Sequence, residues 1–446
     1  MVPAERAGAS HRIRRSNVER VDVAVIGAGL AGLSCAYTLA KAGLDVLVVE
    51  RGDYPGSKNV TGGRLYMNPV RQYLPEIWEE APFERHVTKE RLTMLSDDSS
   101  LTVELRSDTY DEQPYHSYTL VRPTFDRWLA DKASAEGAAV VSKYKVDQLL
   151  REGKKIVGIR AEGEDIGANV VVAADGAMSF IAKEAGLRSK HEPEHFAVGV
   201  KETVELPRKT IEDRFNLRDD EGAAQLYFGS VTKGLTGGGF LYTNRESLSI
   251  GIVVGVGSVM ADPRHLETFQ LMEEFKQRRE VSALIEGGET VEYSAHTIPE
   301  GGIESLTTLY DDGILVVGDA AGFALNMGII VRGMDLAIAS GVMAAETIKS
   351  ASKRNDYSAA SLATYQDMLG NSFVMKDLRT FRNVWRVLNN PRLFAKYPRA
   401  INTLLTELMF VGPDPKPKLS STVLRELRKS FLNLSTVKDA LDLLKV

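Results

Sequence analysis

The feature that most constrains the fold is the segment VDVAVIGAGLAGLSCAYTLAKAGLDVLVVERG at residues 21–52. It holds an apolar run, three glycines, an amphipathic stretch and a second apolar run, and this order predicts a Rossmann-type βαβ unit. In such a unit Gly27 permits a tight turn, Gly29 lets a diphosphate approach the backbone, and Gly32 lets helix and strand pack closely. Glu50 lies twenty-one positions after Gly29, where a carboxylate can accept hydrogen bonds from a ribose. The segment therefore predicts a dinucleotide site with its phosphates at the helix N-terminus.

Later segments decide between FAD and a nicotinamide dinucleotide. Each brings glycine or a charged residue to the end of an apolar run or to the start of a helical one. The residues concerned are Arg51, Gly62, Gly63, Arg64, Arg122, Asp175, Gly176, Gly318 and Asp319. Asp319 alone could be only a helix cap, but one long cofactor contacted by distant segments fits an extended FAD better than NAD. FAD is therefore the predicted cofactor.

Composition narrows the class of protein. With 446 residues, 43% hydrophobic and 26% charged, the chain is long enough for two interlocked domains and an appendage. No apolar run approaches the roughly 18 to 20 residues that span a bilayer, and the first twenty residues lack the apolar segment of a signal peptide. We therefore expect a cytoplasmic protein whose residues 1–20 form a disordered tail.

The side chains offer no catalytic or metal-binding set. The one cysteine, Cys35, lies inside a predicted helix and is expected to be a buried packing residue. A single thiol cannot hold an iron–sulfur cluster, which takes four protein ligands. The seven histidines are scattered, and no nucleophile stands beside a base. The sequence thus predicts no metal site and no catalytic side chain, with the chemistry carried by the flavin.

Residues 190–296 differ in character from the dinucleotide segments. Strand-like runs follow one another there, with an alternation at Leu248, Ile250 and Ile252 that suits a sheet covered on one face. Such a sheet over the flavin would form a mostly apolar slot for a flat hydrophobic ligand. The three glycines at 237–239 are expected to mark a tight turn rather than a binding element.

Positive charge gathers near the C-terminus. Residues 371–430 contain twelve Lys plus Arg and four Asp plus Glu, a net charge of +8, against −5 for the whole chain. Apolar residues recur there at helical spacing, which predicts basic amphipathic helices that lie on anionic lipid, dock an acidic partner, or cover the flavin domain. Phe381 and Trp385 are the aromatic residues expected to insert if the surface is a membrane.

Over nearly all of the chain after residue 20 the sequence resembles a known family. The motifs YPGSKNVTGG, RPTFDRWLADKA, GGGFLYTNRESLSIGIVVG, GDAAGFALNMG and RGMDLAIASGVMAAE are similar to those of the FixC-type flavoproteins, short relatives of electron-transfer-flavoprotein:quinone oxidoreductase. The resemblance implies that the ADP half of FAD is held by Gly27, Gly29, Gly32 and Glu50. It further implies that Arg122 lies near the pyrophosphate and Asp319 on the ribityl chain. The isoalloxazine would lie beside Asn326, Met327 and Gly328.

The same resemblance implies the architecture. It is an α/β fold with a glutathione-reductase-like FAD-binding domain built on a Rossmann-type parallel sheet, an inserted sheet-rich quinone domain and a helical C-terminal region. The expected boundaries are 21–84, 116–187 and 296–352 for the FAD-binding domain, 85–115 and 188–295 for the quinone domain, and 353–446 for the helical region.

The implied activity is electron transfer from an electron-transfer flavoprotein to a membrane quinone. The implied partners are the α and β subunits of that flavoprotein, a ferredoxin-like iron–sulfur subunit, quinone and the membrane surface, with no nucleic acid. The chain would form the high-potential branch of an NADH-oxidising, electron-bifurcating complex that also reduces ferredoxin or flavodoxin. It would be peripheral on the inner face of the membrane within that complex.

Two alternatives stay open. A prenyl-reducing flavoenzyme resembling geranylgeranyl reductases shares the glycine motif, but those proteins typically follow the GDAA turn with a proline, whereas residues 326–332 hold none. A non-enzymatic prenyl-binding protein of the same fold would hold no FAD. The missing proline moves weight away from the prenyl-reducing class. A helix beginning near Gly333 would aim its positive end at the flavin and stabilise an anionic reduced or semiquinone form, which can pass electrons singly.

Overall fold

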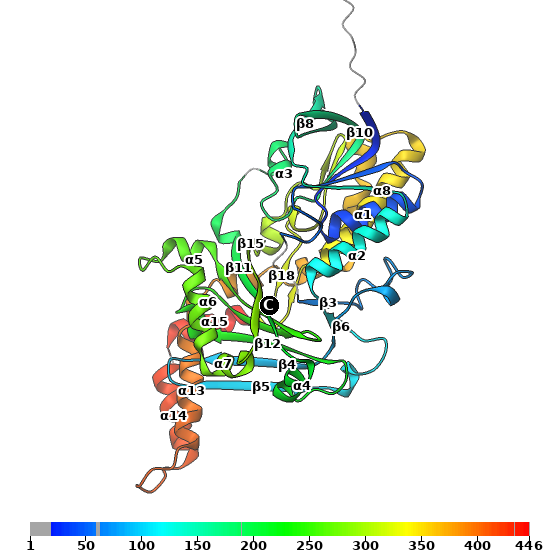
Figure 1. Ribbon diagram of the computed structural model, residues 1–446. Coiled ribbons are helices and arrows are strands. Elements are labelled where there is room, and N and C mark those ends of the chain that lie inside the picture. Colours follow the sequence, from blue (N-terminus) through cyan, green and yellow to red (C-terminus); the bar gives the residue numbers. More distant parts are fainter. Residues whose placement is uncertain (1–18, 59–62, 189, 432, 446) are drawn as a thin grey trace, which may run out of the picture.

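A computed structural model of the chain describes residues 19–58, 63–188, 190–431 and 433–445 (Figure 1). The predicted tail up to residue 18 and the predicted cofactor residue Gly62 lie outside the described residues. Glu19 and Arg20, expected in the tail, instead begin the first strand, where they pair with residues 166 and 167.

The first layer is a sheet whose central strands run parallel, in the order β16-β17-β10-β1-β2-β7. Its strands are β1 (Glu19–Ile26), β2 (Val46–Glu50), β7 (Ala139–Ser142), β10 (Glu164–Ala173), β16 (Tyr310–Asp311) and β17 (Ile314–Val316), with β8 (Val146–Glu152) and β9 (Lys155–Ala161) joined to β10. Val23, Ala24 and Val25 are fully buried, as expected for a strand covered on both faces. The predicted Rossmann-type sheet is confirmed.

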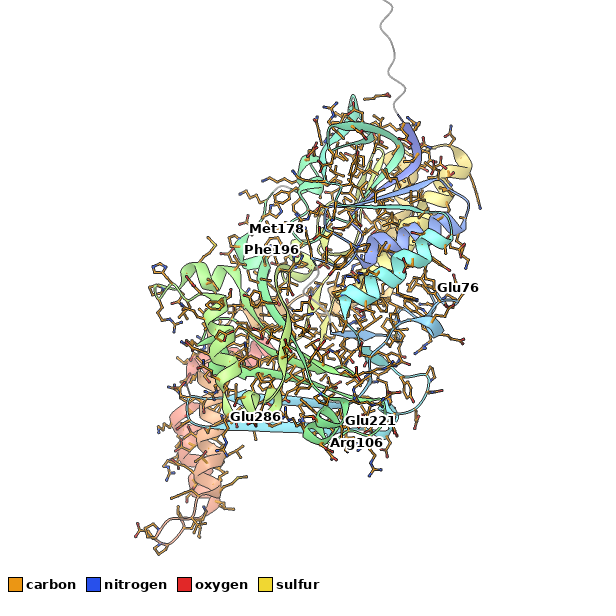
Figure 2. The ribbon with its side chains drawn as sticks, viewed as in Figure 1. Glu76, Arg106, Met178, Phe196, Glu221 and Glu286 are labelled. Atoms are coloured by element: carbon orange, nitrogen blue, oxygen red, sulfur yellow. The ribbon has the colours of Figure 1, made fainter. Side chains whose placement is uncertain are left out.

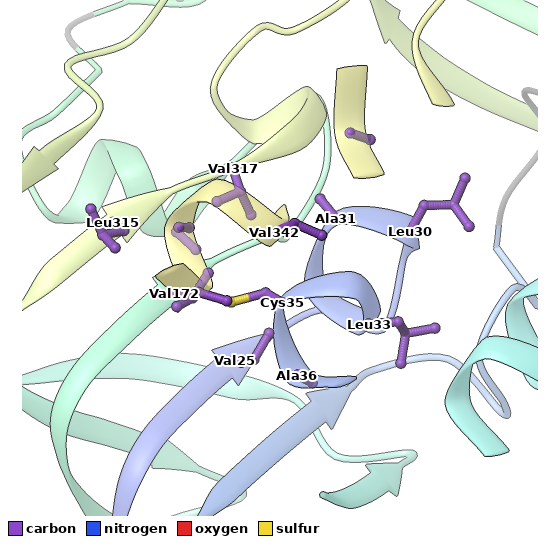
Figure 3. Close-up of a cluster of buried hydrophobic side chains, with 14 of the residues drawn as sticks. Val25, Leu30, Ala31, Leu33, Cys35, Ala36, Val172, Leu315, Val317 and Val342 are labelled. Carbon is purple, nitrogen blue, oxygen red and sulfur yellow. The ribbon is translucent and has the colours of Figure 1, made fainter. Parts of the chain in front are cut away.

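Three helices complete this layer: α1 (Leu30–Lys41), α2 (Arg122–Ala135) and α8 (Met334–Arg354), with the short α3 (Phe180–Glu184) nearby. A Cβ on Gly341 would lie 2.1 Å from the carbonyl oxygen of Ala31, so α1 and α8 pack backbone to backbone. Cys35 lies in this core with Val25, Val172 and Val342 (Figure 3). Burial raises the pKa of its thiol, and the predicted packing role of Cys35 is confirmed.

The second layer is a largely antiparallel sheet in the order β15-β11-β14-β13-β12-β4-β6-β3, with β5 paired to β4. Its strands are β3 (Arg64–Tyr66), β4 (His86–Leu95), β5 (Ser100–Arg106), β6 (Ser117–Thr119), β11 (Phe196–Glu205), β12 (Glu221–Gly229), β13 (Gly237–Thr243), β14 (Ser247–Gly255) and β15 (Glu289–Pro299). β3 and β6 fall within segments predicted for the FAD-binding domain, but they pair here. The chain therefore passes between the two domains more often than the predicted boundaries allow.

One face of the second sheet carries its own core. Leu248, Ile250 and Ile252 are fully buried there, as their alternation predicts. The helices that cover this face are α4 (Arg208–Phe215), α6 (Thr268–Gln277) and α7 (Arg279–Ile285), while α5 (Val256–Ala261) follows β14. The opposite face is left to form the cavity described below.

The glycines at 237–239 do not form the predicted tight turn, because all three lie in β13. A Cβ on Gly238 would lie 2.6 Å from the carbonyl oxygen of Tyr227, and one on Gly239 would lie 2.7 Å from the ring of Phe275. Gly237 has a φ of +133°, which disfavours any side chain there. The prediction missed that glycine in a strand can mark a close approach of other groups.

Seven helices follow α8 in the described chain: α9 (Ala359–Leu362), α10 (Thr364–Asn371), α11 (Phe373–Thr380), α12 (Val384–Leu388), α13 (Lys396–Met409), α14 (Leu419–Ser430) and α15 (Leu434–Leu443). α13 rests on β4 and β12, where the Asn402 amide donates to the Met94 and Ser99 carbonyl oxygens. Beyond that contact, α13 and α14 project from the body as a hairpin (Figure 1). Within the described ranges, none of the helices is long and apolar enough to cross a bilayer.

The two aromatic residues expected to meet a membrane are half-buried and pack against other parts of the protein. The Trp385 indole N–H donates to the Glu194 carbonyl oxygen at 3.2 Å, and its ring stands edge-on to His195. Phe381 packs against the core of the FAD-binding sheet. Helical spacing identified an apolar face correctly but could not say that this face is covered by the protein itself.

Candidate functional site

A cavity of about 1010 Å³ opens between the two sheets. Its upper rim is formed where the parallel strands β1, β2, β10 and β17 end, and its lower wall is the free face of the second sheet. In Figure 2 the cavity-lining Met178 and the start of β11 at Phe196 lie where the two parts of the molecule meet, whereas Arg106 and Glu221 mark the far end of the second sheet. A crevice at the carboxyl ends of parallel strands is where α/β proteins bind ligands.

The glycine loop has the geometry that the motif predicts. Gly27 has a φ of +105°, and a Cβ there would lie 2.3 Å from the Ala174 carbonyl oxygen. A Cβ on Gly32 would lie 2.1 Å from the Gly27 carbonyl oxygen, so α1 must meet β1 at a glycine. A Cβ on Gly29 would meet nothing within 4 Å. Gly29 caps α1 without a side-chain hydrogen bond, which leaves free backbone N–H groups facing the cavity.

Glu50 stands at the end of β2 beside this loop. One carboxylate oxygen accepts from the Ala28 N–H at 2.9 Å and the other accepts from the Gly52 N–H at 2.6 Å. The carboxylate thus braces the glycine loop and still has lone pairs that face the cavity. Arg51 follows it and also lines the cavity.

Arg122 begins α2 and is 6% exposed. Its guanidinium binds Asp126, one turn along the helix, through Nε–Oδ1 and Nη2–Oδ2 contacts of 2.8 Å. This pairing fixes the guanidinium at the cavity wall, and Arg122 lowers the pKa of both His296 and Asp319 at this side. Burial is the larger cause at both groups: it lowers the pKa of His296 and raises that of Asp319 to about 6.

Asp175 and Gly176 end the turn after β10. The Asp175 carboxylate accepts from the Ser179 hydroxyl at 2.7 Å and from the Ile181 N–H at 3.1 Å, so it caps the short α3. Burial raises its pKa, and these hydrogen bonds oppose the rise. Gly176 lies opposite His296, whose Nε2 would be 4.0 Å from a Cβ at that position. His296 is a cavity residue that the sequence did not single out.

The far end of the cavity is formed by a small hairpin of β18 (Leu325–Asn326) and β19 (Val331–Arg332). The Asn326 side-chain oxygen accepts from the Gly328 N–H at 2.8 Å, and its amide group donates to Glu300 at 3.1 Å. α8 begins directly after the hairpin at Met334, with Gly333 and Met334 lining the cavity. The predicted helix N-terminus is therefore present at this end.

Two arginines flank the hairpin end. Arg332 binds Asp335, in the first turn of α8, and Asp377 of α11, with an Nη1–Oδ2 distance of 2.5 Å to the latter. Arg64 forms an ion pair with Glu90 and lies 4.5 Å from the Tyr66 ring centre. Both guanidinium groups line the cavity while their charge is balanced by carboxylates.

The structure brings most of the predicted cofactor residues to one cavity. The residues that line it are Gly27, Gly29, Glu50, Arg51, Gly63, Arg64, Arg122, Asp175, Gly176, Asp319, Asn326 and Gly328. Three others are near it without lining it: Gly32 and Gly318 serve helix packing, and Met327 packs against the core. Their individual contacts with the cofactor stay predictions.

The residues that the sequence missed lie on the second sheet and just beyond the end of its strand β15. They include Gly237, Gly238, Gly239, Phe228, His296 and Glu300. A signal existed for the glycines, since GGGFLYT continues the alternation of a strand. No local pattern marked His296 or Glu300, because tertiary packing alone brings β15 to the cavity.

The residues present fit FAD. The open backbone at Gly29 and the start of α1 suit a diphosphate. The cavity continues from there past Asp319 to the hairpin, so an elongated ligand can lie along it. When bound, FAD would supply the redox chemistry. The hairpin and the N-terminus of α8 are predicted to meet its isoalloxazine.

Three protein-family models match stretches of the chain. A model described as "FAD binding domain" matches residues 20–216, and one described as "ETF-QO, ubiquinone-binding" matches residues 196–298. A third, described as "ETF-QO/FixC family C-terminal domain", matches residues 386–446. The second stretch runs from the start of β11 almost to the end of β15 and thus includes much of the lower cavity wall.

Curated relatives match over nearly their whole length. A probable electron transfer flavoprotein-quinone oxidoreductase, YdiS of Escherichia coli, is 42% identical over 95% of this chain and 98% of its own. Protein FixC of Salmonella typhi is 41% identical over 94% of this chain and 97% of its own. Protein FixC of Bradyrhizobium diazoefficiens is 40% identical over 95% and 98%.

Solved structures share the fold at low identity. A geranylgeranyl bacteriochlorophyll reductase-like protein from Thermoplasma acidophilum has a TM-score of 0.70 and 22% identity, covering 96% of this chain and all of that one. A flavoprotein/dehydrogenase from Cytophaga hutchinsonii has a TM-score of 0.59 and 18% identity, covering 96% and 99%.

The family match, the fold and the cavity agree. The glutathione-reductase-like FAD-binding fold is confirmed, FAD is the cofactor, and an oxidoreductase rather than a prenyl carrier is the class to which the relatives belong. The chain belongs to the electron transfer flavoprotein-quinone oxidoreductase/FixC family and is a FAD-dependent oxidoreductase.

Proposed function

We propose that this protein takes electrons from an electron transfer flavoprotein and passes them through FAD to a quinone. The observation that carries the proposal is the continuity of the cavity. The glycine loop of α1, the Asn326 hairpin and the face of β12 and β13 all line the same space. A ring that enters over the second sheet therefore reaches the hairpin end of the FAD site without a separate channel.

The wall at the hairpin end is mostly apolar. Leu226, Phe228 and Phe240 project from the second sheet, and Leu388 and Phe394 come from the C-terminal helices. Phe228 and Phe394 stack with their ring centres 6.4 Å apart. The glycines at 237–239 add bare backbone between these side chains. Such a slot suits a planar hydrophobic headgroup.

Stopped-flow mixing of the reduced protein with candidate acceptors tests this function. We expect rapid oxidation of the flavin by a soluble quinone analogue and none by a polyprenyl alkene. Rapid oxidation by the alkene, with none by the quinone, would move the protein to the prenyl-reducing class. Phe228→Ala should weaken the quinone's apparent affinity, whereas Phe269→Ala, at an exposed phenylalanine outside the cavity, should not.

We also propose that the chain works within a multisubunit complex. The chain is proposed as the high-potential branch of an NADH-oxidising, bifurcating complex that also reduces ferredoxin or flavodoxin, with a ferredoxin-like iron–sulfur subunit. One cysteine in the whole sequence supports an iron–sulfur cluster on a separate subunit. Isolation of the complex with its neighbouring subunits, followed by NADH-driven ferredoxin reduction, tests this. A complex that reduces quinone but never ferredoxin would limit the function to electron transfer flavoprotein and quinone.

The proposed membrane contact lies at the tip of the α13–α14 hairpin. Met409, Phe410 and Val411 are 78%, 68% and 75% exposed there, and Lys416 and Lys418 in the same loop are exposed. Apolar side chains beside basic ones suit an anionic bilayer surface. Further exposed apolar residues follow on α14, on α15 and at the C-cap of α15, namely Leu419, Leu424, Leu434, Val437, Leu441 and Leu444. These supply a larger surface for lipid or a partner subunit.

Sedimentation with anionic liposomes tests the tip. Changing Met409, Phe410 and Val411 to Ser should reduce binding at least about tenfold, since even one fully inserted apolar side chain is worth roughly 1.5 kcal/mol or more. The matched control is Val103→Ser with Leu105→Ser, at two exposed apolar positions of β5. Equal loss in both variants, or in neither, would remove the tip as the membrane contact.

A further inference from the structure

The end of β15 runs along the cavity from its phosphate end to its hairpin end. Residues 295–300, at the end of β15 and just beyond it, all line the cavity. His296 lies at the phosphate end, beside Arg51 and Arg122. Burial is the main cause that lowers the pKa of His296, and the two arginines lower it further. An extended strand advances about 3.3 Å per residue, so Glu300 lies about 13 Å farther along, at the hairpin end.

Glu300 is attached to the hairpin. Its backbone N–H donates to the His195 carbonyl oxygen at 2.8 Å, which fixes the residue where β15 ends. Its Oε1 accepts from the Asn326 amide at 3.1 Å, and the Asn326 oxygen in turn accepts from the Gly328 N–H. The carboxyl group is thus held beside the residues that are predicted to contact the isoalloxazine.

The other carboxyl groups that line the cavity have different neighbours. Glu50 and Asp175 accept backbone N–H groups at the phosphate end, and Glu184 accepts the Leu149 N–H. Asp147 pairs with Lys145, and Asp319 lies beyond the end of β17. Among the described lining residues, Glu300 is the carboxyl group that is hydrogen-bonded to the hairpin.

We propose that Glu300 donates a proton to a quinone oxygen as the quinone is reduced in this cavity. The inference rests on the proposed function and names a residue for it. Reduction of a quinone to a quinol takes two electrons and two protons. Two electrons and one proton come from the reduced, anionic FAD, and the second proton leaves the Glu300 carboxyl group. The resulting carboxylate recovers a proton from water, so atoms and charge balance over each turnover.

Burial raises the pKa of Glu300, while the hydrogen bond from Asn326 favours the carboxylate and opposes the rise. A carboxyl group with a raised pKa can hold a proton nearer neutral pH and release it to a developing oxyanion. The charged groups on the neighbouring elements are already paired: Arg332 with Asp335 and Asp377, Arg64 with Glu90, and Glu304 with Arg386; the His195 ring stands against Trp385.

Glu300→Gln in the FAD-loaded protein separates proton delivery from electron transfer. General acid catalysis contributes typically about a hundredfold or more, so oxidation of the reduced variant by a soluble quinone should slow on the order of a hundredfold. Oxidation by ferricenium, which takes one electron and no proton, should be unchanged. The wild-type quinone rate should fall as pH rises through the pKa of Glu300, and the variant should lose that dependence.

Glu304→Gln is the matched control, because Glu304 lies four positions away and is not among the cavity-lining residues. It should behave as the wild type with both acceptors. Glu300→Asp, which keeps the acid, should recover part of the quinone rate. An unchanged quinone rate in Glu300→Gln would overturn the proposal, and so would equal slowing with quinone and ferricenium.

An infrared difference spectrum between oxidised and reduced FAD gives a readout that does not depend on quinone turnover. A band from a protonated carboxyl group should change with the redox state in the wild type and in Glu304→Gln, and should vanish in Glu300→Gln. A band that persists in Glu300→Gln would assign the proton to another residue. If quinone fails to oxidise the wild type, the proposed function fails, while the spectrum still decides whether Glu300 exchanges a proton.

Discussion

The two ends of the cavity are built by different means. At the phosphate end, a bare glycine backbone and a helix N-terminus face the ligand, and Glu50 braces the loop through two backbone N–H groups. At the hairpin end, side chains from distant segments meet, and Glu300, Asn326 and Arg332 are held by one another or by α11. Backbone recognition is a local property of the chain, whereas the side-chain arrangement is a product of the whole fold.

The largest expected effect is the loss of FAD affinity when the bare backbone at the phosphate end is given a side chain. Gly29→Val keeps an ordinary backbone angle, because Gly29 has a φ of −86°, but its side chain would fill the space at the start of α1. Loss of two backbone hydrogen bonds to a charged diphosphate costs about 3 kcal/mol or more, so FAD should bind at least about a hundredfold more weakly. Titration of the FAD-free protein measures this.

Gly333→Val is the matched variant at the other end. Gly333 also caps a helix that faces the cavity, and a Cβ there would meet nothing within 4 Å. Because side chains dominate that end, we expect a smaller loss of FAD affinity than in Gly29→Val. Equal losses in the two variants would break the comparison, since both ends would then depend on bare backbone.

This difference explains what the sequence could predict. Gly27, Gly29, Gly32 and Glu50 occupy fixed positions within one βαβ unit, so their spacing alone places them. Glu300 is different, because it meets Asn326 only after β15 has paired with β11 and the β18–β19 hairpin has folded. A short apolar or polar stretch carries no information about which distant stretch it will contact.

The second prediction concerns Asp319, a buried carboxyl group that lines the cavity. Burial raises the pKa of Asp319 to about 6, so ionising it costs stability in the FAD-free protein. Relative to Asp319→Asn, the wild type therefore loses stability as pH rises from the unfolded pKa near 3.9 through about 6. A shift of about two pKa units corresponds to at most about 3 kcal/mol. Thermal unfolding of the FAD-free variant should show it more stable at pH 8, with the gain absent below about pH 4.

Asp53→Asn is the control for that measurement, because the Asp53 side chain is 76% exposed and pairs only loosely with Lys143. It should show no comparable gain at pH 8. A pH-independent difference in Asp319→Asn would mean that the substitution acts through packing. The region around Asp319 would then resemble the hairpin end, where the arrangement of side chains decides the structure.

Glu50→Ala should have a moderate effect on FAD binding. It removes the predicted acceptor for the ribose hydroxyl groups and also the acceptor for the Ala28 and Gly52 N–H groups. A charged hydrogen bond is worth roughly 1.5 to 3 kcal/mol, so affinity should fall on the order of ten- to a hundredfold. Glu50→Gln keeps one acceptor oxygen and should lose less. Unchanged affinity in Glu50→Ala would refute the ribose assignment.

The smallest expected effect lies at the hairpin end, where Asp377 of α11 reaches Arg332. The Asp377 side chain is 30% exposed and that of Arg332 is 11% exposed, so the ion pair is partly buried. We expect the charge of Asp377 to act on bound FAD, because its partner Arg332 lines the cavity at the predicted isoalloxazine end. Arg332 faces two carboxylates, Asp335 and Asp377, and this net negative charge disfavours an anionic reduced FAD. Asp377→Asn leaves one carboxylate per guanidinium and should therefore raise the midpoint potential of bound FAD by about 30 mV, a tenfold change for a two-electron couple.

A spectroscopic redox titration measures this shift, with Asp367→Asn as the control on the neighbouring helix α10, since Asp367 is exposed and does not line the cavity. High salt should leave most of the effect, because the Arg332 side chain is only 11% exposed and buried charges are weakly screened. A potential that falls in Asp377→Asn would mean that Arg332 moves away from the flavin once its second carboxylate is removed. In that case α11 sets the position of Arg332 rather than its net charge, and the C-terminal helices control the hairpin end through geometry.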